Sequence, residues 1–388
     1  MITSPLSLQH SFVIPRCLRC TAALILSLVA TAVHADIIFT AKVMGPVTSI
    51  YAVDESGNLK KITADERWRD MDPDRRKGWV TFSSDREKDA KIDMYKTSED
   101  YNVYVIKDNG KSLRKITDSP YDDVVPKLSP DTKYVGYVHQ PPDQKQELRV
   151  VKRGGGRNRV LATADTILDL SWSPDGKSIA YAPAVGTDSM LMTVDMAGGE
   201  PRSLVKVSIA PPPADAKDTE GFLTQIVSVQ WSPDGEKIAY IRHPLKQGAV
   251  RELHVFNLKT GANFRVSDAV AQVQHPIVWS ADSSKLLYSA LIGYRYYYDE
   301  KTYKKVYEGG MEIFLSTLEG DKVTTLQLTK GDDLFKSPTF SPDEKRIAFL
   351  YADALEERTL SLRIMNLDGT DMKELYNSVA QRSYLQWK

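Results

Sequence analysis

The stretch Trp172-Ser173-Pro174-Asp175-Gly176, followed by the apolar strand Ser178-Ile179-Ala180-Tyr181, decides the fold of this chain because close variants of it recur. Further copies are Leu128-Ser129-Pro130-Asp131, Trp231-Ser232-Pro233-Asp234-Gly235, Trp279-Ser280-Ala281-Asp282 and Phe340-Ser341-Pro342-Asp343. We predict a weaker copy at Asp72-Pro73-Asp74, before Trp79, and the chain ends at Tyr384-Leu385-Gln386-Trp387-Lys388, where another copy would begin. Repeats of roughly 40 to 60 residues indicate a solenoid, a propeller or an array.

The repeated phrase has the composition of a tight hairpin turn. Ser suits the first position of a type I turn, Pro presets the second, and Asp and Gly suit the last two. We interpret its Asp as a turn residue, with a catalytic role as the alternative. Each copy continues with an apolar strand, a variable stretch, a second strand such as 191–194, a Gly-rich turn and a third strand that often ends in Thr. Four short strands per unit favour closed or radial all-β packing.

The two ends of the repeat region complement each other. Residues 37–40, 49–53 and 58–63 have the pattern of the last three strands of a unit, and residues 383–387 have the pattern of its first strand. Pairing them removes an open sheet edge. We therefore predict an all-β, seven-bladed β-propeller of four-stranded blades, closed by pairing the C-terminal strand (383–388) with the N-terminal blade. The predicted blades are 36–63 with 383–388, 64–117, 118–163, 164–207, 221–267, 270–330 and 331–378.

The phrase, the aromatic residue before it and the Thr-ending outer strand resemble the propeller repeat of the periplasmic TolB family and of the dipeptidyl peptidase family. The resemblance covers nearly all of the chain after residue 35. TolB-like proteins carry a separate N-terminal domain and six blades, whereas strands are predicted here directly after residue 35 and we count seven blades. The peptidases carry a Gly-x-Ser-x-Gly elbow, which this sequence lacks. The resemblance implies a propeller alone and leaves the function open, since one propeller hosts many activities.

Residues 1–35 are typical of a signal peptide, which leaves residues 36–388 as a single propeller domain. Arg16 and Arg19 precede the apolar run 22–30, and small residues precede Asp36. The run is short for a membrane span, although an uncleaved leader is the alternative. Both cysteines, Cys17 and Cys20, lie in the leader, so we expect no disulfide in the mature chain. We also expect no membrane span once the leader is removed. Export without disulfides favours a periplasmic location.

The charge pattern argues against a nucleic-acid partner. The chain has 51 Lys and Arg residues against 51 Asp and Glu residues, with no basic stripe for a phosphate backbone. Metalloprotease, Ca-loop and complete phosphate-loop motifs are missing from the sequence. We therefore expect no cofactor and assign no catalytic residue.

The long loop insertions are all predicted on one face of the propeller, where loops join the second strand to the third and one blade to the next. They are 85–100, 140–147, 183–190, 206–223, 242–251, 289–311 and 351–359. Because binding residues concentrate on loops held by a rigid scaffold, this loop face is the predicted working surface. Its most unusual insertion, residues 293–307, contains Tyr294, Arg295 and Tyr296 and has the pattern of a long hairpin turning near 299–302. Tyr beside Arg and Lys suits recognition of a protein or a glycan. The alternative is a hairpin that buries its rings against its own blade.

Two further sets of residues are expected on the same face. Arg242 and His243, with Arg251, form a second candidate binding site, whose alternative is a solvated loop. His139, His243 and His275 are a weaker alternative as metal ligands, because their spacing is not that of a ligand set.

These features predict a periplasmic, non-catalytic binding or scaffold propeller that engages an envelope or periplasmic protein through its loop face. A glycan is a second partner class. The alternative function is a propeller lyase or hydrolase that acts on a polysaccharide or peptide in the axial funnel. A binding module would show a broad aromatic patch, whereas an enzyme would show convergent carboxylates or histidines in a deep pocket.

Overall fold

The computed structural model describes residues 36–388 except 65–66, 87–99, 215–220, 247–248 and 304. These described residues form 28 β-strands and contain no helix, so the predicted all-β class is confirmed. The predicted leader, residues 1–35, lies outside the described residues. Within the described ranges no helix is present that could span a membrane.

Four sheets contain four strands each, and in each sheet neighbouring strands pair antiparallel in chain order. They agree with the predicted units 64–117, 118–163, 164–207 and 221–267. Their strands are β4 (Asp70–Arg76), β5 (Trp79–Ser84), β6 (Asn102–Lys107) and β7 (Arg114–Lys115); β8 (Asp122–Leu128), β9 (Tyr134–Gln140), β10 (Gln146–Lys152) and β11 (Arg159–Ala164); β12 (Thr166–Trp172), β13 (Ser178–Val185), β14 (Asp188–Asp195) and β15 (Arg202–Ser208); β16 (Thr224–Trp231), β17 (Lys237–Pro244), β18 (Glu252–Asn257) and β19 (Asn263–Arg265).

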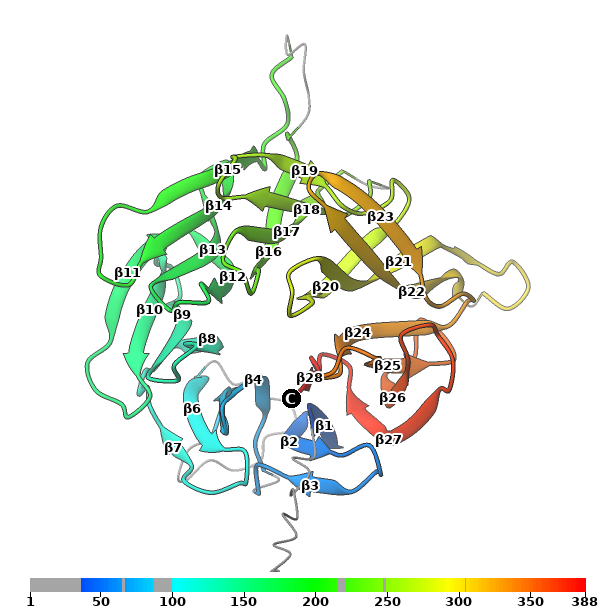
Figure 1. Cartoon of the computed structure of the whole chain (residues 1–388), viewed down its shortest axis with the longest axis horizontal. Helices are drawn as coiled ribbons and strands as arrows, with labels where there is room; N and C mark the ends of the chain where they lie inside the picture. Colours follow the sequence, from blue (N-terminus) through cyan, green and yellow to red (C-terminus); the bar gives the residue numbers. More distant parts are fainter. Residues whose placement is uncertain (1–35, 65–66, 87–99, 215–220, 247–248, 304) are drawn as a thin grey trace, which may run out of the picture. The chain divides into compact units, whose positions relative to one another are not determined.

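The other twelve strands form one continuous sheet of three groups. Single residue pairs join the groups, Met311 with Leu334 and Ala41 with Val379. Figure 1 shows the sheets and groups following one another around a common centre. The groups are β20 (Gln272–Trp279), β21 (Lys285–Tyr298), β22 (Lys305–Glu319) and β23 (Lys322–Gln327); β24 (Leu334–Phe340), β25 (Arg346–Ala352), β26 (Thr359–Asn366) and β27 (Lys373–Ala380); β1 (Ile37–Met44), β2 (Val47–Val53), β3 (Leu59–Lys61) and β28 (Gln386–Trp387).

The five clear copies of the phrase share one hydrogen-bond network. In Ser129–Lys133 the Ser hydroxyl donates to Asp131 at 2.7 Å, and the backbone N–H of Lys133 donates to the same carboxylate at 3.0 Å. The fourth turn residue, Thr132, donates its N–H to the Ser129 carbonyl and has φ of 60°. The same hydroxyl-to-carboxylate bond joins Ser173 to Asp175, Ser232 to Asp234, Ser280 to Asp282 and Ser341 to Asp343. The predicted turn role of these aspartates is confirmed.

The aromatic residue before the turn connects neighbouring sheets. Trp172 Nε1 donates to the Lys127 carbonyl of the preceding sheet at 2.9 Å, and Trp279 Nε1 donates to the Gln230 carbonyl at 3.0 Å. Apolar clusters fill the space between consecutive sheets, as where Ile50 packs with Phe82. In these two copies the Trp therefore binds the neighbouring sheet, whereas Trp231 Nε1 donates to the Gly235 carbonyl of its own turn.

Two local predictions are wrong. Asp72-Pro73-Asp74 lies inside β4, and the turn before Trp79 is Lys77-Gly78, because the weak copy lacks the Ser that would bind the turn Asp. The stretch 183–190 is not a long insertion, since β13 and β14 continue through it and leave only Gly186 and Thr187 between them.

The last residues of the chain contact the first strand and the neighbouring sheet. Ile37 pairs with Trp387 and Ile38 with Gln386, antiparallel. The Thr40 N–H donates to Ser383 Oγ at 2.8 Å. Trp387 is 4% exposed and packs in the core cluster that contains Ile37. Of the predicted segment 383–388, Gln386 and Trp387 pair with the N-terminal strand β1.

Replacing Trp387 with Ala should lower the free energy of unfolding by about 3–5 kcal/mol, because it empties a large buried site. Deleting residues 383–388 should lower the melting temperature further or cause aggregation, because it also leaves the β1 edge unpaired. Urea denaturation of the full chain measures the first effect. Tyr303→Ala, at a residue that is 83% exposed, is the control. Equal midpoints for Trp387→Ala and wild type would contradict the core role.

The turn aspartates should make stability depend on acid pH. The hydroxyl of Ser129 and the N–H of Lys133 lower the pKa of Asp131 to about 2, and Ser280 and Ser284 lower the pKa of Asp282 to about 2. A depressed pKa stabilises the fold above the unfolded pKa, near 4, and this stabilisation is lost as the pH falls toward 2. The neutral double variant Asp131→Asn, Asp282→Asn should lose less stability than wild type between pH 5 and pH 3 in urea titrations. If the free energy of unfolding fell equally with pH in the double variant and in wild type, this prediction would be refuted. Asp321→Asn, in another turn, is the control.

Candidate functional site

The strands β4, β8, β12, β16, β20 and β24, which lie toward the centre in Figure 1, each carry a bulge near the middle. In six groups the pairing with the second strand skips one or two residues at this point. A bulge re-aims side chains out of the ladder and is common beside functional sites. The skipped residues are Asp72–Pro73, Val125–Pro126, Leu168–Asp169, Val227, His275–Pro276 and Ser337–Pro338.

Five of these bulges contribute to the wall of a cavity of about 780 Å³. Asp72, Val125, Leu168, Asp169, Val227 and His275 all line it, together with Tyr384 next to β28. Because His243 at the end of β17 and Arg251 in the β17–β18 connection also line it, the cavity lies toward the predicted loop face. We call it the loop-face cavity. Its volume is in the range of small-molecule sites.

The loop-face cavity contains charges of both signs. Asp72 lies near Lys127 and Arg382, which lower its pKa, but burial is the larger effect and the net shift is upward. Asp169 serves the fold, because its carboxylate accepts hydrogen bonds from the Leu170 and Val229 N–H groups and the Ser228 hydroxyl at 2.8–3.1 Å.

A histidine and a tyrosine meet at the inner end of this cavity. His275 Nδ1 lies 2.7 Å from Ser228 Oγ, and its ring packs edge-on against Tyr384 with centroids 4.7 Å apart. Burial lowers the pKa of His275, so the neutral imidazole is favoured at neutral pH. Burial raises the pKa of Tyr384 to about 12, with Asp72 adding to the shift, so its hydroxyl keeps its proton.

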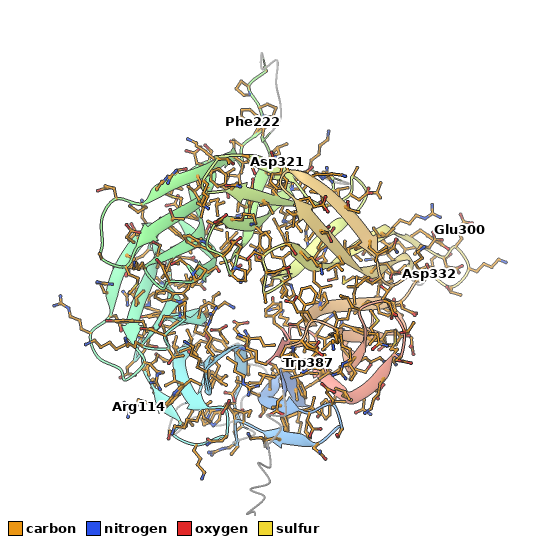
Figure 2. All side chains as sticks on the ribbon, viewed as in Figure 1. Arg114, Phe222, Glu300, Asp321, Asp332 and Trp387 are labelled. Atoms are coloured by element: carbon orange, nitrogen blue, oxygen red, sulfur yellow. The ribbon has the colours of Figure 1, made fainter. Side chains whose placement is uncertain are left out.

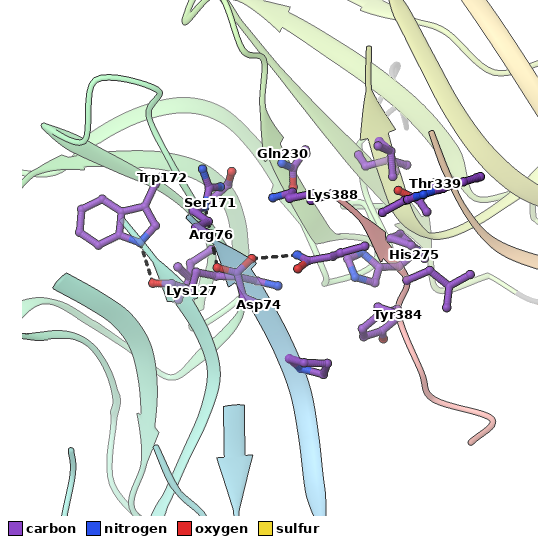
Figure 3. Close-up of a pocket in the computed structure, with 18 residues that line it drawn as sticks. Asp74, Arg76, Lys127, Ser171, Trp172, Gln230, His275, Thr339, Tyr384 and Lys388 are labelled. Carbon is purple, nitrogen blue, oxygen red and sulfur yellow. Dashed lines mark hydrogen bonds and ion pairs between the residues drawn. The ribbon is translucent and has the colours of Figure 1, made fainter. Parts of the chain in front are cut away.

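A second cavity, of about 190 Å³, is lined by Trp172 and other residues that lie closer to the Ser-Asp turns, and Figure 3 draws its lining residues. Lys127, His275 and Tyr384 line both cavities. In this turn-face cavity the Asp74 carboxylate accepts bonds from Gln386 Nε2 at 2.9 Å and from the Leu128 N–H at 2.8 Å. Removal from bulk water lowers the pKa of Lys388, which lines the same cavity, to about 8.

The predicted Tyr hairpin forms as expected. β21 and β22 extend beyond the other strands of their sheet, and Figure 2 shows Glu300 at the far end of this extension. Lys305 Nζ lies 3.8 Å from the ring centroid of Tyr296, and Arg295 forms an ion pair with Glu308. The exposed fractions of the hairpin tyrosines are 36% for Tyr294, 53% for Tyr296, 47% for Tyr297, 64% for Tyr298 and 83% for Tyr303.

Arg242 and His243 lie at the end of β17, close to the loop-face cavity rather than to the hairpin. Arg242 Nε is 3.9 Å from Glu252. His243 lines the cavity, and burial, with Arg251 as a smaller cause, lowers its pKa. Of the binding residues predicted from the sequence, His243 therefore lines the cavity. Asp72, Lys127, Arg382 and Tyr384 line it too but were not predicted as site residues.

Two of the three histidines of the metal alternative have separate partners, and His243 lines the loop-face cavity. Buried His139 bonds to Asp123 at 2.7 Å, and His275 bonds to Ser228. In the part of the chain that the structure describes, no group of three or more His, Cys, Asp or Glu residues is arranged to hold a metal ion. The structure does not bring His139, His243 and His275 together as a ligand set.

Comparison with known proteins identifies the type of propeller. Residues 109–284, less than half of the chain, match the family model of the lipoprotein LpqB β-propeller domain. A search of curated protein sequences finds no significant match. Among solved structures, a puromycin-hydrolyzing peptidase of Mycobacterium tuberculosis is similar with a TM-score of 0.56 at 11% identity, over 89% of this chain and 54% of that one.

Two further solved structures are covered over more than four fifths of their own length. The β-propeller domain of the Trilobed protease from Pyrococcus furiosus has a TM-score of 0.50 at 15% identity, over 80% of this chain and 84% of that one. TolB from Acinetobacter baumannii has a TM-score of 0.49 at 14% identity, over 90% of this chain and 82% of that one. The described chain is thus a β-propeller. The match of residues 109–284 to the LpqB β-propeller model supports the predicted resemblance to TolB-like propellers, and the solved structures support the propeller fold.

Asp169 should be required for stability, because it joins β12 to β16 across two sheets. Asp169→Ala leaves the Val229 N–H and Ser228 hydroxyl without this acceptor, which should lower the free energy of unfolding by about 1–3 kcal/mol. Asp332→Ala, at an exposed residue between β23 and β24, is the control. Urea denaturation of the two variants measures the difference, and equal stabilities would show that the bond contributes nothing.

Proposed function

We propose that this protein is a non-catalytic binding or scaffold propeller of the cell envelope, which engages a protein partner through the Tyr hairpin of its loop face. The observation that carries the proposal is the exposure of five tyrosines on one hairpin. Aromatic side chains exposed together mark interaction surfaces, and Tyr and Arg are enriched at interface hot spots.

The geometry of the hairpin suits a preformed surface. Tyr294 stacks on Tyr307 with centroids 6.3 Å apart, and Lys305 lies over both Tyr296 and Tyr307. Twelve residue pairs join β21 to β22 across the ladder. Because these contacts order the rings before binding, little conformational entropy remains to be lost on association. A glycan remains the second partner class, since stacked tyrosines with a cation also suit sugars.

The location and architecture belong to the same proposal. We infer a seven-bladed ring closed by β28, because four sheets and three groups of four strands are present and β28 pairs with β1. We infer a periplasmic location from the apolar leader at 1–35. The match of residues 109–284 to the propeller of a lipoprotein supports an envelope location.

The loop-face cavity favours a second candidate function, a lyase or hydrolase that acts on a polysaccharide or peptide at the propeller axis. Asp72, His275 and Tyr384 converge there in a cavity large enough for a substrate. The similar peptidase from Mycobacterium tuberculosis is a puromycin-hydrolyzing enzyme, of which this chain spans about half. Turnover of peptides or oligosaccharides by the purified protein, lost in Asp72→Asn, would favour this candidate over the binding role.

Replacing Tyr294, Arg295 and Tyr296 with Ala should weaken partner binding by at least tenfold, since truncation of one hot-spot residue costs about 2 kcal/mol or more. Capture from envelope extract identifies the partner, and titration with that purified partner gives the affinity. The matched control replaces Lys322, Thr324 and Leu326 in β23 of the same group, whose side chains are partly or fully exposed.

Thermal stability measured on the same samples separates binding from folding. The ring should melt at the wild-type temperature in both triple variants, because the hairpin end lies beyond the core clusters. Equal affinities of the two variants would place the partner surface elsewhere. A lower melting temperature with proportionally lower binding would mean that the tyrosines serve the fold.

A further inference from the structure

Five titratable side chains that line the loop-face cavity make no hydrogen bond or ion pair with another described residue. They are the Asp72 carboxylate, the Lys127 ammonium, the Arg382 guanidinium, the Tyr384 hydroxyl and the His243 imidazole. Asp169 and Arg251, which also line the cavity, are different, because Asp169 binds the backbone and Arg251 donates to Gln274 Oε1 at 2.7 Å. The five groups are therefore available to a ligand.

The charge of these available groups favours an anion. Lys127 and Arg382 carry two positive charges against the single carboxylate of Asp72. Both cations act on Asp72, and Arg382 also acts on Lys336 and Tyr384, so they belong to one electrostatic environment. A ligand carboxylate between an ammonium and a guanidinium would form charge-assisted hydrogen bonds in a site partly removed from water.

The remaining wall of the cavity is apolar. Met71, Val125, Leu168 and Val227 line it, and Leu168 is 38% exposed although it lies in the middle of a strand. A purely polar ligand, such as inorganic phosphate, would leave this apolar surface unused. The wall therefore matches an organic ligand with an apolar part.

We propose that the loop-face cavity binds a small carboxylic acid that has an apolar body and a hydrogen-bond donor. The carboxylate lies between Lys127 and Arg382, the donor faces the carboxylate of Asp72, and the apolar body packs against Val125, Leu168 and Val227. The donor is an ammonium in an amino acid or a hydroxyl in a hydroxy acid, and both share this chemistry. The site is independent of the Tyr hairpin, so it goes beyond the proposed partner binding.

Isothermal titration calorimetry with four matched probes tests the proposal on the full chain. Leucine and 2-hydroxy-4-methylpentanoate have the carboxylate, the donor and the same apolar body. Leucinamide lacks the carboxylate, and 4-methylpentanoate lacks the donor. Leucine or 2-hydroxy-4-methylpentanoate, or both, should bind. The affinity should be at least tenfold higher than that of leucinamide and also higher than that of 4-methylpentanoate.

Two variants locate the bound carboxylate. Lys127→Met and Arg382→Gln should each weaken binding of the acid by about tenfold or more, as expected for loss of a charge-assisted hydrogen bond. The matched controls are Lys133→Met, in the turn after the same strand, and Arg358→Gln, in an exposed loop; neither should change the affinity. Melting temperatures of all four variants verify that the fold is intact.

Asp72→Asn distinguishes the two sources of the donor. An amino acid should lose more affinity than a hydroxy acid in this variant, because its ammonium loses a charged partner while a hydroxyl keeps a neutral acceptor. Failure of both acids to bind at millimolar concentration, or equal binding of leucinamide and leucine, would overturn the proposal. Unchanged affinity in both Lys127→Met and Arg382→Gln would do the same. None of these outcomes depends on the hairpin variants.

Discussion

The hydrogen bonds of residues 383–388 connect parts of the chain that are far apart in sequence, and the arrangement of the innermost strands depends on them. Ser383 accepts the N–H of Thr40, 343 positions away. Gln386 accepts the N–H of Arg75 and donates to Asp74, so the same short segment contacts the first strand and the neighbouring sheet. Contacts of such separation form against a large loop-closure entropy and slow the folding of all-β domains. The same segment carries Tyr384, so the order of the cavity wall depends on the contact that joins the two ends.

Much of the fold could be predicted because the repeat encodes its own hydrogen bonds. Ser129 and Asp131 bind each other and the turn backbone, and these bonds are complete within the six residues 129–134, so the pattern is visible in sequence. The turn predicted at Asp72-Pro73-Asp74 is wrong because Pro and Asp also suit a β-bulge, which is what the structure has there. X-Pro recurs in four inner strands, at Pro73, Pro126, Pro276 and Pro338, and proline is tolerated at a bulge because it has no N–H to leave unpaired.

The candidate site was less predictable because its members come from different repeats. The Tyr hairpin was found from composition and length, both of which are local properties. Lys127, Arg382 and Asp72 are ordinary charged residues in sequence, and only the arrangement of strands around one centre brings them to one cavity. His139 shows the opposite error: its place at a strand end matched the expected face, yet its ring is buried against Asp123. The recurring X-Pro pair was the one available signal of which residues face the axis.

The bulges separate the residues that pair in the sheets from residues that line the loop-face cavity. Residues before and after each bulge form the ladder with the second strand, whereas the skipped residues take no part in that pairing. Natural variation at Val125, Leu168 or Val227 therefore alters the cavity surface while the ladder hydrogen bonds stay the same. A lineage carrying this scaffold could change its ligand by point substitution at these few positions. The hydrogen bonds of the Ser-Asp turns and of Trp172 and Trp279 would stay the same.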